Sequence, residues 1–155
     1  PLSEFGRGQV SQARSALERY PVEIVLTSPL TRALQTAHGL FGGHPNLPRI
    51  QVAPLLRERV ENSCDIGRAP ADLAEEFPSV DLSQLNDTWW HNDGQPDARG
   101  ICVEPIPVVE ARVAQFKIDL VARTERVLAL VGHGTFFYYL TGKVMANCEV
   151  TEFVC

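Results

Sequence analysis

Two strand-to-helix junctions carry side chains that could bind a phosphate. Arg32 follows the apolar run 22–26 at the start of a predicted helix, and His133 follows the apolar run 127–131 between two glycines. A helix amino end beside a guanidinium favours a phosphate, because backbone N–H groups and a planar cation both face the anion. If the two strands are parallel neighbours, both side chains lie at the sheet edge where ligands bind in open α/β folds.

Each junction also has an ordinary structural interpretation. Arg32 could be a solvated surface arginine, and His133 could be a histidine that only makes a structural hydrogen bond in its turn. The glycines beside His133 let the backbone and a ligand approach each other closely. The phosphate interpretation depends on the pair, because two strand ends that each deliver a phosphate ligand are harder to dismiss than one.

The apolar periodicity predicts the elements that would position these side chains. We expect helices over residues 1–20, 29–37, 70–77, 106–120 and 135–140, and strands over 22–26, 50–53, 127–131 and 149–154. Ser3 and Ser28 are the expected helix caps, with Pro29 as the first helical residue, and residues 82–89 should add an amphipathic turn or two. Alternating strands and helices predict an α/β fold, a three-layer α/β/α sandwich with a mainly parallel sheet, formed by a single domain over 1–155.

Composition narrows the class of partner. The chain has 14 Lys and Arg against 19 Asp and Glu, a net charge of -5, which argues against nucleic acid and requires a local basic pocket for any anion. No run of about 18 apolar residues occurs, so we expect no membrane-spanning segment. Cys64, Cys102, Cys148 and Cys155 lack C-x-x-C pairing and are expected to be reduced thiols in a cytoplasmic protein. Histidines and cysteines show no metal-ligand spacing, so we expect no metal and no cofactor.

Three segments, in this order, resemble motifs of the histidine phosphatase superfamily in its phosphoglycerate mutase-like branch. They are residues 28–37 (Ser-Pro-Leu-Thr-Arg-Ala-Leu-Gln-Thr-Ala), 56–59 (Leu-Arg-Glu-Arg) and 131–134 (Val-Gly-His-Gly). Residues 1–9 are similar to the segment that follows the family's first motif, so the resemblance covers nearly the whole chain. It implies a phosphoglycerate mutase-like fold and phosphoryl transfer through a histidine.

The resemblance also implies a role for each matching residue. Arg32 would clamp the phosphoryl oxygens, and His133 would stabilise charge on the transferring group. Glu58 would protonate the leaving oxygen and then activate the water that cleaves phosphohistidine. Glu61 is the rival acid or else a solvated carboxylate, and Arg59 is either a contact for a second anionic group of the substrate or a surface charge.

The family's nucleophile lies in an Arg-His-Gly motif that this sequence does not contain. His38 ends a helix, and His44 and His91 lie in loops, so none of them has the context of that motif. We therefore expect the nucleophile on a strand upstream of Pro1, and a chain that is incomplete at its amino end and also at its carboxyl end. The alternative is an inactive relative.

The expected function is hydrolysis of a small phosphorylated metabolite through a phosphohistidine intermediate. The 155 residues alone should not hydrolyse the substrate, because they lack the nucleophile. One alternative is a mutase with the same machinery. Another is an inactive relative that binds a phosphorylated ligand or a protein partner. Residues 65–100 form a long insertion without a recognisable motif, and such insertions often make lids or substrate walls, so we expect specificity to lie there.

Overall fold

The computed structural model describes residues 1–154. Within them, a sheet of three parallel strands has the order β2-β1-β3. The strands are β1 (Ile24–Thr27), β2 (Arg49–Val52) and β3 (Leu128–Val131). Thr27 lies opposite both Val52 and Val131, so the strands end together at one edge of the sheet.

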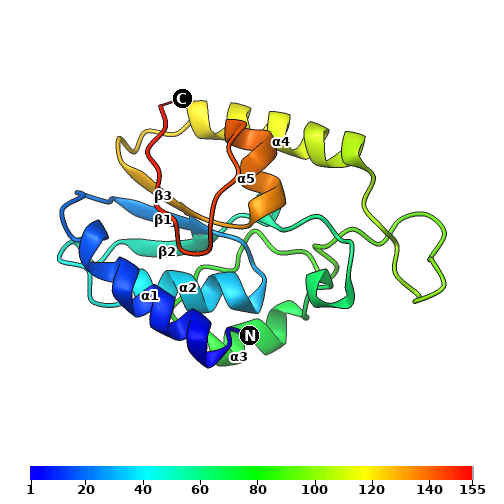
Figure 1. Ribbon diagram of the computed structural model, residues 1–155, viewed down its shortest axis with the longest axis horizontal. Helices are drawn as coiled ribbons and strands as arrows, with labels where there is room; N and C mark the ends of the chain where they lie inside the picture. Colours follow the sequence, from blue (N-terminus) through cyan, green and yellow to red (C-terminus); the bar gives the residue numbers. More distant parts are fainter. Residues whose placement is uncertain (155) are drawn as a thin grey trace.

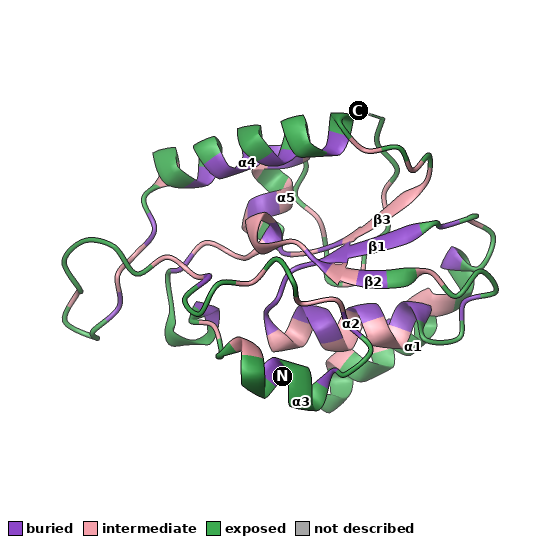
Figure 2. Cartoon of the chain, turned by 180° about the vertical axis from the view of Figure 1, so that it is seen from behind, coloured by how far each residue is buried: buried purple, intermediate pink, exposed green. Residues whose placement is uncertain are grey.

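Helices cover both faces of this sheet (Figure 1). On one face lie α1 (Glu4–Leu17), α2 (Thr31–Phe41) and α3 (Pro70–Glu76), and on the other lie α4 (Ile106–Val121) and α5 (Gly134–Thr141). The buried stripes of α2 and α4 turn toward the sheet (Figure 2). The expected three-layer α/β/α architecture is therefore confirmed. Among the helices of residues 1–154, none is both long enough and apolar enough to cross a membrane.

The central strand β1 contributes to two separate apolar cores. Val25 packs with Leu34 of α2 on one face. Ile24 and Leu26 pack with Phe136 of α5 on the other. Because both faces of β1 are covered by helices, each of them needs apolar side chains, which explains the unbroken apolar run in the sequence.

The two predicted helix caps had different outcomes. Oγ of Ser3 accepts a hydrogen bond from the N–H of Gly6, 3.2 Å away, and Ser3 caps α1 as expected. The Ser28 prediction was wrong, because α2 begins at Thr31 and Leu30 is its N-cap residue. Oγ of Ser28 accepts instead from the N–H of Leu30, at 3.2 Å. This hydrogen bond lies in the turn that connects the end of β1 to the start of α2.

The largest error concerns the predicted strand over 149–154. In the described part of the chain, these residues form no strand and follow an irregular path past β3 (Figure 1). Alternating apolar residues are compatible with a strand, but a strand also needs a paired neighbour. Residues 82–89 form a single hydrogen-bonded turn, from the N–H of Leu85 to the carbonyl of Leu82 (2.9 Å), and no helix.

Candidate phosphate site

The carboxyl ends of β1 and β3 bring Ser28 and His133 into contact. The strands pair in parallel with Thr27 opposite Val131, and each chain leaves the sheet directly afterwards. Nε2 of His133 lies 2.8 Å from Oγ of Ser28, and both side chains are buried. Arg32 follows in the first turn of α2. The predicted placement of Arg32 and His133 at the carboxyl edge of adjacent parallel strands is therefore confirmed.

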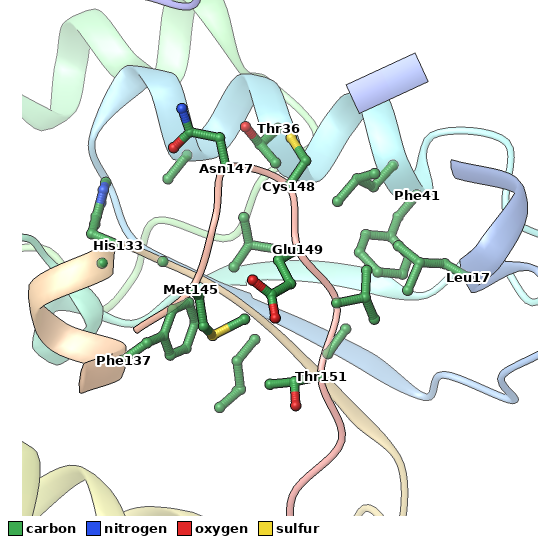
Figure 3. A pocket seen from close by; sticks show the side chains of 18 of the residues that line it. Leu17, Thr36, Phe41, His133, Phe137, Met145, Asn147, Cys148, Glu149 and Thr151 are labelled. Carbon is green, nitrogen blue, oxygen red and sulfur yellow. The ribbon is translucent and has the colours of Figure 1, made fainter. Parts of the chain in front are cut away.

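A cavity of about 1180 Å³ opens beside β3, and Arg32, Glu58 and His133 contribute to its lining. Most of the remaining lining comes from α1, α2, the end of α4, residues 125–131, α5 and the segment 145–154. Figure 3 shows this segment crossing the cavity in front of β3, with His133 at one end. The cavity explains why the apolar side chains at the start of β3 are only half buried, unlike those of β1.

The guanidinium of Arg32 is held by the loop around Asp65. One terminal nitrogen donates to the carbonyl of Cys64 (2.7 Å), and the other donates to Oδ1 of Asp65 (2.9 Å). Asp65 is buried, and its Oδ2 accepts a hydrogen bond from the N–H of Asn62 (3.0 Å). These contacts fix the orientation of a group that has five N–H donors in a rigid plane. Asp65 was not among the residues predicted from the sequence, although Asn62 and Asp65 have the spacing of a capping box.

The imidazole of His133 is uncharged at neutral pH. Burial lowers its pKa from the ordinary 6.5 to about 3, and the positive charges of Arg32 and Arg112 contribute further. A buried imidazolium would lose its hydration without gaining an anionic partner, so the neutral form is favoured. The site therefore combines the guanidinium of Arg32 with a neutral imidazole.

The carboxylate of Glu58 faces the amino end of α5. Its Oε1 accepts a hydrogen bond from the N–H of Arg59 (2.8 Å), and its Oε2 accepts from the N–H of Thr135 (3.3 Å). Thr135 is the residue after Gly134, the first residue of α5. Orphan N–H groups and the helix dipole at this end favour a carboxylate. The local geometry thus orients Glu58 from both sides.

Among the residues that the structure describes, Arg59 and Glu61 do not line the cavity. Nε of Arg59 donates to the backbone carbonyl of Glu104 (2.8 Å), and a terminal nitrogen donates to Oε1 of Glu61 (2.9 Å). The side chain of Glu61 is 56% exposed. Of the five sequence-predicted residues, Arg32, Glu58 and His133 therefore line one cavity. Arg59 and Glu61 form an ion pair outside its lining.

A buried ion cluster behind Glu58 was also missed. Oε1 of Glu104 accepts from Arg57 (2.8 Å), and its Oε2 accepts from Arg112 (2.8 Å). All three side chains are buried or nearly so. A usable signal existed, because Arg112 lies beside Val113 on the apolar stripe of the predicted helix 106–120, where a charged residue needs a buried partner.

The other three histidines do not line the cavity in the structure of residues 1–154. His44 is buried; its Nε2 donates to the carbonyl of Leu17 (3.2 Å), and its Nδ1 accepts from the N–H of Asn46 (3.2 Å). The ring of His38 packs against Phe77. His44 thus has both ring nitrogens engaged in structural hydrogen bonds.

The cysteines that the structure describes form no disulfide bond. Cys64, Cys102 and Cys148 are free thiols, and Cys155 lies outside the described residues. Across residues 1–154, His, Cys, Asp and Glu side chains do not gather in groups of three or more that could hold a metal ion. At the carboxyl edge of the sheet, the cavity lining includes the guanidinium of Arg32, the imidazole of His133 and the carboxylate of Glu58.

Known proteins are similar to this chain in sequence or in fold over nearly all of its length. The chain is 28% identical to phosphoglycerate mutase-like protein 1 of Arabidopsis thaliana, over 99% of this chain and 64% of that protein. YhfR of Bacillus stearothermophilus superposes with a TM-score of 0.60 at 25% identity, over 92% of this chain and 66% of YhfR. A mycobacterial glucosyl-3-phosphoglycerate phosphatase in complex with inorganic phosphate superposes with a TM-score of 0.58 at 26% identity, over 91% and 67% of the two chains.

The chain thus spans about two thirds of the length of these relatives. The sequence pattern of the histidine phosphatase superfamily (branch 1) matches residues 1–153. That match contains the three quoted segments, and the parallel α/β/α fold places Arg32, Glu58 and His133 around one cavity. On this agreement of sequence, fold and site, the chain belongs to the histidine phosphatase superfamily.

Proposed function

We propose that this chain supplies the phosphate-binding and proton-transfer groups of a phosphatase that acts on a small phosphorylated metabolite through phosphohistidine. The observation that carries the proposal is the convergence of Arg32, Glu58 and His133 on one cavity at the carboxyl edge of the sheet. Membership of a superfamily whose structural neighbours include phosphatases supports the reaction class.

Arg32 and His133 are the proposed phosphate ligands. The guanidinium of Arg32 presents a rigid plane of donors to the phosphoryl oxygens, in an orientation held by Asp65. The neutral imidazole of His133 donates a hydrogen bond to the transferring group. A phosphate dianion beside it supplies the anionic partner that the buried ring lacks, which raises the pKa of His133 and favours proton uptake.

Glu58 is the proposed general acid and base. It protonates the leaving oxygen and then takes a proton from the water that attacks phosphohistidine. Glu61 is less suitable, because it is exposed and pairs with Arg59 outside the cavity lining. Arg59 is proposed to contact a second anionic group on longer substrates, which would replace Glu61 as its partner.

The attacking imidazole is proposed to come from a segment outside these 155 residues. The sequence has no Arg-His-Gly, and His133 is the histidine in the described cavity lining. β3 pairs with β1 on one side, while the cavity borders its other side within the described residues. A strand paired there would end beside His133, where a histidine could attack the phosphorus in line with the leaving oxygen.

Mutase-type phosphoryl transfer is the second candidate, supported by the Arabidopsis relative that is named phosphoglycerate mutase-like. The two reactions share the phosphoenzyme and differ in the acceptor, which is water for a phosphatase and a substrate hydroxyl for a mutase. An inactive relative that binds phosphorylated ligands or a protein partner would form no phosphoenzyme.

A panel of small phosphomonoesters, tested on the full-length protein, separates these candidates. We expect phosphate release together with an acid-labile, base-stable phosphoryl label. Arg32→Ala should lower turnover by about 100-fold or more, the range for a group that stabilises developing charge. Arg49→Ala is the matched control, because Arg49 is exposed and lies outside the cavity lining. Isomerisation of a phosphorylated substrate without phosphate release would favour the mutase, and absence of label and turnover would favour an inactive relative.

A further inference from the structure

We propose that the buried ion pair between Glu104 and Arg112 is the positioning device for Glu58, holding the backbone on both sides of that carboxylate. The inference rests on the proposed function, because it matters only if Glu58 transfers the proton. Neither Glu104 nor Arg112 belongs to the cavity lining, so neither would touch a substrate held there.

The backbone around Glu58 is bound to this pair at three carbonyls. One terminal nitrogen of Arg112 donates to the carbonyls of Leu55 (2.7 Å) and Arg57 (2.8 Å). The backbone N–H of Glu104 donates to the carbonyl of Val60 (2.8 Å). These anchors lie on both sides of position 58, so the pair sets where the chain places the Glu58 side chain.

Arg112 also contacts the second element that orients Glu58. Its guanidinium lies 5.4 Å from the ring centroid of Phe136 in α5, next to Thr135, whose N–H donates to Glu58. One guanidinium therefore packs against both the loop that carries the carboxylate and the helix that the carboxylate faces.

The geometry of the pair requires a guanidinium rather than only a positive charge. Nε and one terminal nitrogen of Arg112 donate to the two carboxylate oxygens of Glu104, at 3.2 and 2.8 Å. The side chains are 3% and 0% exposed. A lysine would keep the charge, and with it the positive potential near His133, but it could not form the fork and also hold two carbonyls. Arg112→Lys thus tests the positioning of Glu58 separately from the positive charge at residue 112.

A displaced acid should slow those reactions that need a proton on the leaving group. In the full-length protein, we expect Arg112→Lys to lower kcat for an alkyl phosphate by about 10-fold or more, since misplacement by about 1 Å has effects of this size. An aryl phosphate with a good leaving group should lose much less. KM for both should change little, because Arg32 and His133 are intact.

Combination with Glu58→Gln distinguishes positioning from a general structural role. If Arg112 acts through Glu58, Arg112→Lys should cause no further loss on the alkyl phosphate once Glu58 is replaced. Arg49→Lys is the matched control: Arg49 is in an ion pair with Asp81, yet its side chain is 62% exposed and outside the cavity lining. It should leave both substrates within about twofold of the wild type.

Equal losses on the two substrates, or an additive loss in the Glu58→Gln background, would overturn the inference while leaving the proposed function intact. If Glu58→Gln alone had no effect on any substrate, the proposed role of Glu58 would fail first. If Arg112→Lys does not fold by circular dichroism, the double variant Glu104→Gln/Arg112→Gln keeps the net charge and is judged by the same criteria. Unfolding of both would also overturn the inference, by making the pair a requirement for folding.

Discussion

Nε2 of His133 lies 2.8 Å from Oγ of Ser28, although 105 residues separate them in the chain. The contact exists because β1 and β3 are paired in parallel and end in register. The position of the imidazole is therefore set by the sheet itself, and its burial at this edge explains its low pKa. Two strand ends together form the base of the phosphate site.

The low pKa of His133 should make folding stability depend on pH. Burial lowers the pKa from 6.5 to about 3, so between these values the unfolded chain binds a proton that the folded chain does not. Stability is then fully present above about pH 6.5 and falls as the pH falls toward 3. At pH 5 the loss relative to pH 7 should be about 2 kcal/mol.

Denaturant unfolding at the two pH values, with and without His133→Gln, measures this contribution. The variant should lose less stability than the wild type when the pH is lowered, by about 2 kcal/mol. Equal pH dependence in the two proteins would mean that His133 is protonated in the folded state at pH 5. The conclusion that burial lowers the pKa of His133 would then be wrong.

Asp65→Asn should weaken the phosphate clamp without removing a phosphate ligand. An amide can accept from Arg32, but it cannot replace both oxygens of a carboxylate that also accepts from the N–H of Asn62. We expect kcat/KM to fall by about 10-fold, because the guanidinium loses its fixed orientation.

Asp97→Asn is a suitable control for this change. Asp97 also pairs with an arginine and accepts backbone N–H groups, but it lies outside the cavity lining. It should retain nearly full kcat/KM. If the two variants behaved alike, Asp65 would only stabilise its loop.

The residues that sequence reasoning found are those with local signals. Arg32 and His133 each follow an apolar strand and precede a helix, so a few neighbouring residues indicate the edge of the sheet. The fold class followed for the same reason, from alternating apolar strands and amphipathic helices. The Leu-Arg-Glu-Arg segment was found through its resemblance to a family, and the structure adds what holds Glu58 in place.

The features that sequence reasoning missed depend on partners far along the chain. Asp65 meets Arg32 across 33 residues, and Glu104 meets Arg57 across 47. The capping-box spacing at Asp65 and the apolar helix face at Arg112 are local signals, but neither identifies the distant residue that each side chain contacts. The predicted strand over 149–154 failed for the related reason that alternation does not supply a neighbouring strand.

Glu58→Gln should separate substrates by their leaving groups. In the full-length protein, we expect a loss of about 100-fold or more for poor leaving groups, because a positioned acid contributes this much. Activated aryl phosphates should lose less, since their leaving oxygens need no proton. Glu61→Gln is the matched comparison and should have little effect, as Glu61 is exposed and outside the cavity lining. Equal losses for all leaving groups would move the role to Glu61 or elsewhere.

The 155 residues by themselves should bind inorganic phosphate without turning over a phosphomonoester. Arg32 provides a positive charge and His133 a hydrogen-bond donor, so phosphate should raise the midpoint of thermal unfolding through binding to the folded state. Arg32→Ala should remove this shift, whereas Arg49→Ala should retain it. Phosphate release should not exceed that of buffer, because the proposed nucleophile lies outside this sequence.

Acid-labile, base-stable phosphoryl labelling provides the decisive comparison. The 155 residues should take up no label, and the same chain preceded by a strand that ends in Arg-His-Gly should take it up and recover turnover. In-line attack requires an imidazole opposite the leaving oxygen, and His44 has both ring nitrogens occupied while His38 packs against Phe77. A label on the short chain that maps to His38, His44, His91 or His133 would show that the nucleophile lies within these residues.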